Sequence, residues 1–127
     1  MTVVADSGPL IHLSIVQCCH LLQQCFPRIS IIPDVVDEVI TQGQGRPGAA
    51  ELHQAIQDGW VRIVPVNDQT MIERLAAPYL SRIDASVIAC AMEHRAMVVL
   101  SDDISVRRVA EREGLSVVGT VGILTHA

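Results

Sequence analysis

Acidic side chains stand at the ends of short apolar runs in this chain, as after Thr2–Ala5 and Met97–Ser101. The acids of interest are Asp6, Glu38, Asp84, Asp102 and Asp103. In an open α/β sheet the carboxyl ends of the strands meet at one edge, and ligand sites form there. Carboxylates crowded at such an edge repel one another, and a hard divalent cation with oxygen ligands relieves that repulsion. The pattern therefore predicts a metal-dependent active site.

The adjacent pair Asp102–Asp103 is the most specific signal, because it directly follows the apolar run Val98–Leu100. Two such acids are costly unless they are solvated, cap a helix or bind a cation. Successive side chains cannot face the same way, so we expect Asp103 to point at the site and Asp102 to serve as a cap or support. Arg107 could steady a phosphate, or it could simply pair with Asp103 one helical turn away.

The other three acids each have a plain structural alternative. Asp6 lies in an Asp-Ser-Gly-Pro sequence typical of turns, where Ser7 could cap a helix or touch a ligand. Glu38 borders an apolar helical stripe and could be a surface carboxylate. Asp84 stands at the start of an apolar helix, where an acid interacts favourably with the helix dipole. These roles and metal binding are compatible with one another.

The composition predicts one aliphatic domain over residues 1–127, since half of the residues are hydrophobic and only three are aromatic. The apolar runs are too short to span a bilayer and no signal peptide is visible, so we expect a cytoplasmic protein without membrane contact. The cysteines form no C-x-x-C pair and have no matching histidine spacing, which indicates buried, reduced thiols. They are Cys18, Cys19, Cys25 and Cys90.

The net charge of −5 argues against broad affinity for nucleic acid, but the five acids singled out above account for all of it. A surface that is negative at one spot binds cations there and phosphate only afterwards. Lysine is absent, which excludes lysine-based mechanisms, and no phosphate-binding loop, dinucleotide motif or serine nucleophile elbow is present. Metal-assisted hydrolysis is the chemistry that remains.

Short β-branched runs alternate with longer helical ones, which predicts a three-layer α/β/α sandwich around a mainly parallel sheet of about five strands. The expected strands are Thr2–Ala5, Arg28–Ile32, Val61–Val66, Met97–Leu100 and Ser116–Val118. The expected helices are Pro9–Gln24, Pro33 to about Thr41, Pro47 or Gly48 to Asp58, Asp68–Ala76, Asp84–Arg95, Ile104–Glu113 and a short last helix capped by Thr120. Residues 42–48 and 77–83 are expected to be loops.

Four segments together resemble the PIN-domain ribonucleases, which include the toxins of VapBC-type toxin–antitoxin pairs. They are residues 4–11, 32–39, 84–91 and 100–103, each carrying one acid of the set or, in the last, the adjacent pair. Residues 59–61, 102–111 and 114–124 are similar to one uncharacterised PIN-like branch. That branch usually carries Gly-Glu where this chain has Ile83 and Asp84, and the shorter Asp implies weaker or water-mediated metal binding.

The resemblance implies a metal-dependent endoribonuclease with a PIN-like fold, the toxin of a type II pair, working as a homodimer and blocked by a small antitoxin. Its metal ligands for Mg²⁺ or Mn²⁺ would be Asp6, Glu38, Asp84 and Asp103, with Asp102 auxiliary. The expected contacts to RNA phosphates are Ser7, Arg82 and Arg107. Two alternatives stay open: a PIN-like binding or regulatory module that no longer cuts, and a flavodoxin-type or receiver-like domain, against which the missing lysine counts.

Overall fold

The computed structural model describes residues 1–76, 78 and 80–126. Across these residues one parallel sheet of five strands runs through the molecule in the order β3-β2-β1-β4-β5. The strands are β1 (Val3–Ala5), β2 (Ile29–Ile31), β3 (Val61–Ile63), β4 (Val98–Leu100) and β5 (Ser116–Val118). The predicted parallel α/β sandwich is therefore confirmed, although most of the strands are shorter than the apolar runs that suggested them.

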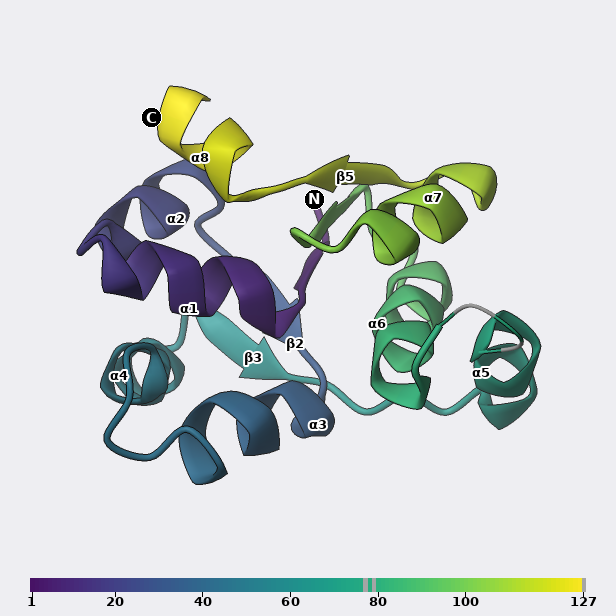
Figure 1. Cartoon of the computed structure of the whole chain (residues 1–127), viewed down its shortest axis with the longest axis horizontal. Coiled ribbons are helices and arrows are strands. Elements are labelled where there is room, and N and C mark those ends of the chain that lie inside the picture. Colours follow the sequence, from purple (N-terminus) through teal and green to yellow (C-terminus); the bar gives the residue numbers. More distant parts are fainter. Residues whose placement is uncertain (77, 79, 127) are drawn as a thin grey trace.

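Helices cover both faces of the sheet (Figure 1). They are α1 (Ser7–Ile15), α2 (Cys19–Cys25), α3 (Pro33–Val36), a π-helical turn η1 (Asp37–Thr41), α4 (Ala49–Asp58), α5 (Gln69–Ala76), α6 (Arg82–Glu93), α7 (Ile104–Arg112) and α8 (Thr120–His126). The chain moves one way along the sheet from β1 to β3 and the other way from β4 to β5. Because parallel crossovers are right-handed, α1–α4 and α5–α7 pack on opposite faces.

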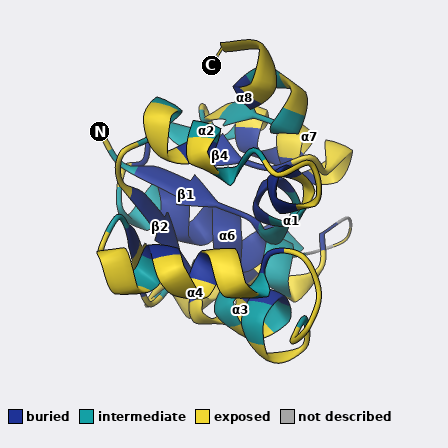
Figure 2. Ribbon diagram, turned by 90° about the vertical axis from the view of Figure 1, so that its left-hand side faces the viewer, coloured by how far each residue is buried: buried dark blue, intermediate teal, exposed yellow. Residues whose placement is uncertain are grey.

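The core is aliphatic and includes β1, β4 and the inner helix α6, which are coloured as buried in Figure 2. It also includes buried residues of α1, α2 and α4, such as Leu13, Leu22 and Leu52. Helix α6 is buried on nearly all sides because its middle residues are mostly small, and seven consecutive residues, Ala85–Ala91, are buried. This agrees with the general rule that a helix apolar all round lies inside the molecule. No helix among the described residues is long and apolar enough to cross a membrane.

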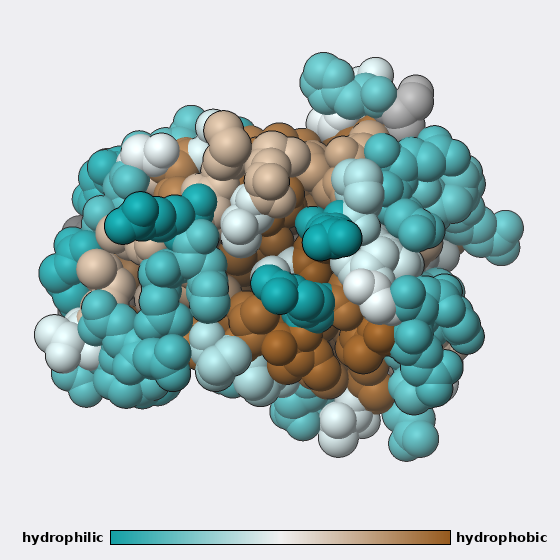
Figure 3. Space-filling model, turned by 180° about the vertical axis from the view of Figure 1, so that it is seen from behind, coloured by the Kyte–Doolittle hydropathy of each residue, from teal (hydrophilic) through white to brown (hydrophobic). Residues whose placement is uncertain are grey.

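Part of the apolar surface remains exposed. Figure 3 shows the face opposite to the view of Figure 1, where a hydrophobic area is bordered by hydrophilic side chains. Ile63 on the edge strand β3 has 47% of its surface accessible, and Met97 before β4 has 63%. The sheet is therefore less completely covered at its β3 edge and near the amino ends of its strands than at its centre.

The structure corrects three local predictions. The single helix expected over Pro9–Gln24 is divided into α1 and α2, because Gln17 adopts a left-handed conformation with φ of 59° and turns the chain. Helix α6 begins at Arg82 instead of Asp84, because the side chain of Ser81 caps it. Of the four cysteines, which are all free, only Cys90 is fully buried. Ala77 and Tyr79, in the expected loop 77–83, lie outside the described residues.

Candidate active site

The acids that follow β1 and β4 meet at the point where the strand order reverses. Ala5 and Leu100 are register partners on these neighbouring strands, and the amide of Asp6 donates a hydrogen bond of 2.8 Å to the carbonyl of Leu100. From this point the chain leaves β1 and β4 toward opposite edges of the sheet, which opens a crevice at their carboxyl ends. Asp6 and the pair Asp102–Asp103 are therefore carried to one place by the backbone itself.

Two helical segments bring the remaining acids to the same edge. Pro33 starts α3 directly after β2, and the helix widens into the π-helical turn that carries Glu38, with the amide of Gln42 bonding the carbonyl of Asp37. Such π turns are frequent at functional sites. Asp84 lies in the first turn of α6, where its amide donates to Ser81 Oγ at 3.1 Å. The cap on α6 thus fixes the backbone position of Asp84.

These side chains line one open pocket of about 580 Å³. The residues that line it are Asp6, Ser7, Gly8, His12, Glu38, Ser81, Ile83, Asp84, Asp102 and Asp103. All five acids singled out in the sequence, together with Ser7, are among them. Arg82 and Arg107, expected to contact phosphate, are not. The guanidinium of Arg82 donates instead to Gln69 Oε1 at 2.8 Å, and that of Arg107 faces the carbonyl of Val117 at 3.5 Å.

Asp6 is the most deeply buried acid of the pocket, with 7% of its surface exposed. This burial raises the pKa of Asp6 to about 6, and the charges of Asp84 and Glu38 add to the rise. Two hydrogen bonds oppose it: Asp6 Oδ1 accepts from the Ser7 amide at 2.8 Å, and Oδ2 accepts from Ser101 Oγ at 3.2 Å. The carboxylate is therefore held firmly in an environment that resists its negative charge.

Asp84 shows the same conflict. Burial raises its pKa, and the charges of Asp103 and Glu38 raise it further against the hydrogen bond to Ser81. The carboxylates of the pocket thus repel one another, and their oxygens are the donors that Mg²⁺ and Mn²⁺ prefer. This donor chemistry fits a hard divalent cation. Within the residues that the structure describes, however, no three potential ligands converge closely enough in this conformation to hold a metal ion.

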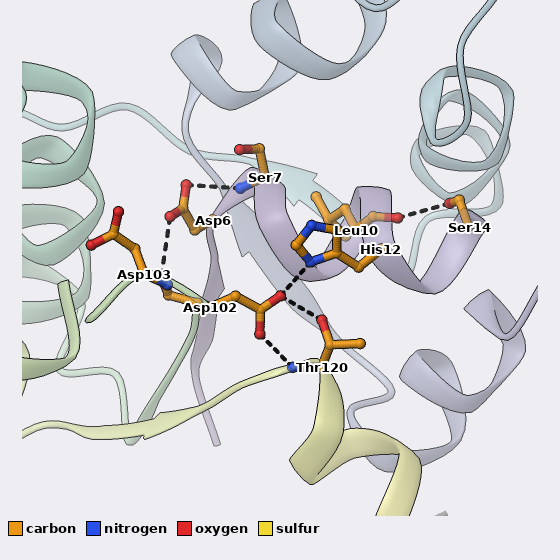
Figure 4. A network of polar contacts seen from close by, with 9 residues as sticks. Asp6, Ser7, Leu10, His12, Ser14, Asp102, Asp103 and Thr120 are labelled. Carbon is orange, nitrogen blue, oxygen red and sulfur yellow. Dashed lines mark hydrogen bonds and ion pairs between the residues drawn. The ribbon is translucent and has the colours of Figure 1, made fainter. Parts of the chain in front are cut away.

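The adjacent acids Asp102 and Asp103 face different partners (Figure 4). Asp103 caps α7, because its Oδ1 accepts hydrogen bonds from the amides of Ser105 and Val106 at 2.7 and 3.1 Å. Among the described residues its Oδ2 has no hydrogen-bond partner. Asp102 instead turns toward α1 and α8, where it contacts His12 and Thr120. Asp103 therefore keeps one oxygen available to the pocket.

The hydrogen bonds of Asp102 also determine its charge state. Burial alone would raise its pKa, but hydrogen bonds from the hydroxyl and amide of Thr120 and from His12 outweigh burial and lower the pKa below its usual value. The backbone leaves room for this arrangement only because residue 119 is glycine. A Cβ on Gly119 would lie 2.7 Å from Asp102 Oδ1. Asp102 is thus a firmly ionised carboxylate with most of its hydrogen-bonding capacity in use.

Four polar residues of this region were not identified as candidates for the site from the sequence: His12, Ser81, Ser101 and Thr120. Ser101 is 1% exposed and connects two acids, because its Oγ donates to Asp6 and accepts from the amide of Asp103 at 3.1 Å. Its position between a buried strand and an acid pair is a signal that the sequence contains. His12 gives no such signal, because only the packing of α1 against the loop after β4 brings it to Asp102.

The chain matches a family model described as a PIN domain over residues 2–127. No curated protein sequence matches it. Among solved structures, a PilT N-terminus domain protein from the archaeon Sulfolobus solfataricus is similar, with a TM-score of 0.72 and 16% identity over 99% of this chain and 92% of that one.

Two toxin–antitoxin structures are also similar. VapBC2 from Rickettsia felis, solved with a DNA fragment from its promoter, has a TM-score of 0.68 and 10% identity over 94% of this chain and 98% of that one. VapC20 from Mycobacterium tuberculosis, a toxin that cleaves the sarcin-ricin loop, has a TM-score of 0.56 and 16% identity, covering 76% and 86%. At these identities the likeness shows a shared fold.

Proposed function

This chain belongs to the PIN-domain family, and on that premise we propose that its acidic pocket cleaves RNA phosphodiester bonds with the help of Mg²⁺ or Mn²⁺. The observation that carries the proposal is the gathering of Asp6, Glu38, Asp84 and Asp103 around one pocket at the switch point of the sheet. The raised pKa values of Asp6 and Asp84 support it, because a cation would relieve the same repulsion that raises them.

Each of the four acids has its own part in the proposed site. Asp6 is oriented from both oxygens, by the Ser7 amide and by Ser101 Oγ, so it forms the fixed floor of the site. Asp103 is held through Oδ1 by the start of α7 and presents Oδ2. Glu38 and Asp84 line the same pocket from the π-helical turn and from the first turn of α6. Asp102 acts as an auxiliary acid through the negative charge it adds at the rim.

A bound divalent cation would supply Lewis acidity toward a phosphate oxygen and lower the pKa of the attacking water. The protein's own residues position the substrate for that step. Ser7 lies at the start of α1, where its hydroxyl can donate to a non-bridging phosphate oxygen. His12 and Ile83 also line the pocket and would contact an RNA strand bound there. Arg82 and Arg107 would reach a phosphate only after their present hydrogen bonds break.

We further propose that the protein is the toxin of a type II pair, a homodimer in the cell that a small antitoxin blocks at this pocket. The similarity to the VapBC2 and VapC20 structures supports this biological role. Expression of the chain alone in a bacterial host should then arrest growth, and expression of Glu38→Gln should not. Purification with the product of the neighbouring gene should yield a stable complex without ribonuclease activity.

The test of the activity is cleavage of a mixed set of structured RNAs with Mn²⁺ or Mg²⁺ and with EDTA. Glu38→Gln and Asp103→Asn should abolish cleavage while the far-ultraviolet spectrum stays unchanged. Asp34→Asn is the matched control, because Asp34 is exposed on the same helical segment as Glu38 and does not line the pocket. Cleavage that survives both variants would reject this site. A folded parent that neither cuts RNA nor binds Mn²⁺ by calorimetry would favour the non-cutting PIN-like module.

A further inference from the structure

A second polar pocket, of about 360 Å³, lies at the opposite end of the strands from the acids. It is formed around the amino ends of β1, β2 and β3, and its lining includes Arg28, Ser30, Gly59 and Arg62. No acidic residue is among the described residues that line it. This is notable in a chain with a net charge of −5, because two of its nine basic residues meet here without a carboxylate between them.

The sheet itself brings the two arginines and the serine together. Ser30 lies in the middle of β2, and Arg28 immediately precedes that strand. Ser30 and Arg62 are register partners on the neighbouring parallel strands β2 and β3. The side chains of Ser30 and Arg62 therefore lie side by side on one face of the sheet. Gly59 ends α4 in a left-handed conformation, and a Cβ there would meet nothing within 4 Å, so the side of the pocket at this residue is open.

Ser30 contributes a hydroxyl to the same pocket as the arginines. The residue is 5% exposed, and none of the side-chain hydrogen bonds among the described residues involves this hydroxyl. The hydroxyl is not among the buried polar atoms of the described residues that lack a partner, so it is accessible to solvent. It can donate a hydrogen bond to a ligand oxygen in the pocket.

The two arginines are equally available. Both are exposed, and within the described part of the chain neither takes part in an ion pair; the pairs found there join other residues. A guanidinium offers a planar set of donors that matches the oxygens of a phosphate group. Two guanidinium groups beside one hydroxyl donor, without a competing carboxylate in the lining, form a site for a multiply charged oxyanion.

We propose that this pocket binds a phosphate group carried by a nucleotide, using Arg28, Arg62 and Ser30 as donors. Its volume lies within the range of small-ligand sites. The phosphate could belong to a free mononucleotide or to the 5′ end of an RNA, because the two present the same terminal group. The site is separate from the acidic pocket and does not require a metal, so it stands or fails independently of the proposed ribonuclease activity.

The experiment is calorimetric titration of the full chain in EDTA with inorganic phosphate, a nucleoside 5′-monophosphate, and a short RNA with or without a 5′-phosphate. Saturable binding of the mononucleotide would show that a free nucleotide is sufficient to occupy the pocket. Binding of only the 5′-phosphorylated RNA identifies the RNA end as the ligand. Both outcomes support the site. If none of these probes binds, the proposal is overturned.

Variants locate the binding. The double variant Arg28→Gln/Arg62→Gln should weaken phosphate binding about tenfold or more, because it removes the charge-assisted hydrogen bonds from both guanidinium groups to the phosphate. Ser30→Ala should weaken it less. Arg95→Gln is the control, since Arg95 is an exposed arginine outside the pocket and its loss should leave affinity unchanged. Equal affinity in the parent and the double variant, or an equal loss in the Arg95 control, would show that the phosphate binds elsewhere or only through general charge.

Discussion

His12 Nδ1 lies 2.6 Å from Asp102 Oδ2, which joins α1 to the loop between β4 and α7 across 90 residues of sequence. Thr120 at the start of α8 binds the same carboxylate through its amide, 2.7 Å from Asp102 Oδ1, and through its hydroxyl. One side chain at the rim of the acidic pocket therefore connects three elements. This arrangement gives Asp102 a structural role that its neighbour Asp103 does not share.

Replacing Asp102 with alanine should therefore cost stability. The change removes the acceptor for His12 and for both donors of Thr120, and leaves the Thr120 amide without its partner. We expect the free energy of unfolding to fall by about 2 kcal/mol, measured by urea denaturation at pH 7. Asp34→Ala, which removes an exposed carboxylate on α3, should change it by less than about 0.5 kcal/mol. A loss no larger than in that control would show that the three contacts do not hold the rim.

The same carboxylate should give the parent an acid-sensitive component of stability. The pKa of Asp102 is lowered by folding, so its contribution is fully present above the unfolded value near 4 and is lost as the pH falls through the lower folded value. Unfolding of the parent and of Asp102→Asn should be compared between pH 7 and pH 2.5. Their difference in free energy should shrink as the pH falls below about 4. The side chains of His12 and Asp102 are partly exposed, so solvent screening keeps this contribution to the free energy of unfolding modest.

Asp6 should behave in the opposite way. Folding raises its pKa from 3.8 to about 6, mainly through burial, so ionised Asp6 destabilises the metal-free protein. The folded state binds the proton more tightly, and stability should fall as the pH rises from about 4 to 6. Asp6→Asn should thus be more stable than the parent at pH 7.5, by up to about 3 kcal/mol, and the gap should narrow below pH 4. Thermal unfolding of both proteins in EDTA at pH 4 and pH 7.5 measures this difference in stability. An Asp6→Asn protein that is less stable than the parent at pH 7.5 would contradict the prediction.

Ser101 should position two acids of the proposed site at once. Ser101→Ala removes a hydrogen bond that favours ionised Asp6, and also the acceptor for the amide of Asp103. We therefore expect a further rise in the pKa of Asp6, which would shift the midpoint of Mn²⁺ binding to higher pH. Calorimetry from pH 5.5 to 8.5 would detect this. Ser105→Ala keeps its backbone contact to Asp103 and serves as the control. An unchanged pH profile in Ser101→Ala would mean that the serine supports the fold alone.

The predictable part of this site depends on local signals, and the rest depends on packing. The parallel sheet and the acids after β1 and β4 follow from apolar runs and their ends, which the sequence displays directly. The different roles of Asp102 and Asp103 depend on the contacts of Asp102 with His12 and Thr120. These two residues lie 90 and 18 positions from Asp102 in the sequence. The break at Gln17 has no glycine or proline to mark it. Arg82 likewise donates a hydrogen bond to Gln69, so it does not line the pocket, and this contact between α5 and α6 could not be predicted from the sequence.

The π-helical turn that carries Glu38 should depend on the small residue that follows it. A Cβ on Gly43 would lie 2.3 Å from the carbonyl oxygen of Val39 and 3.3 Å from that of Glu38, so alanine forces the end of the turn to move. We expect Gly43→Ala to lower the free energy of unfolding by about 1 to 3 kcal/mol and to weaken Mn²⁺ binding by displacing Glu38. Gln44→Ala, in the same exposed segment, should change neither. Combining Gly43→Ala with Glu38→Gln separates the two effects: the double variant should bind Mn²⁺ no more weakly than Glu38→Gln alone. A further loss of affinity in the double variant would show that Gly43 acts on the pocket through residues other than Glu38.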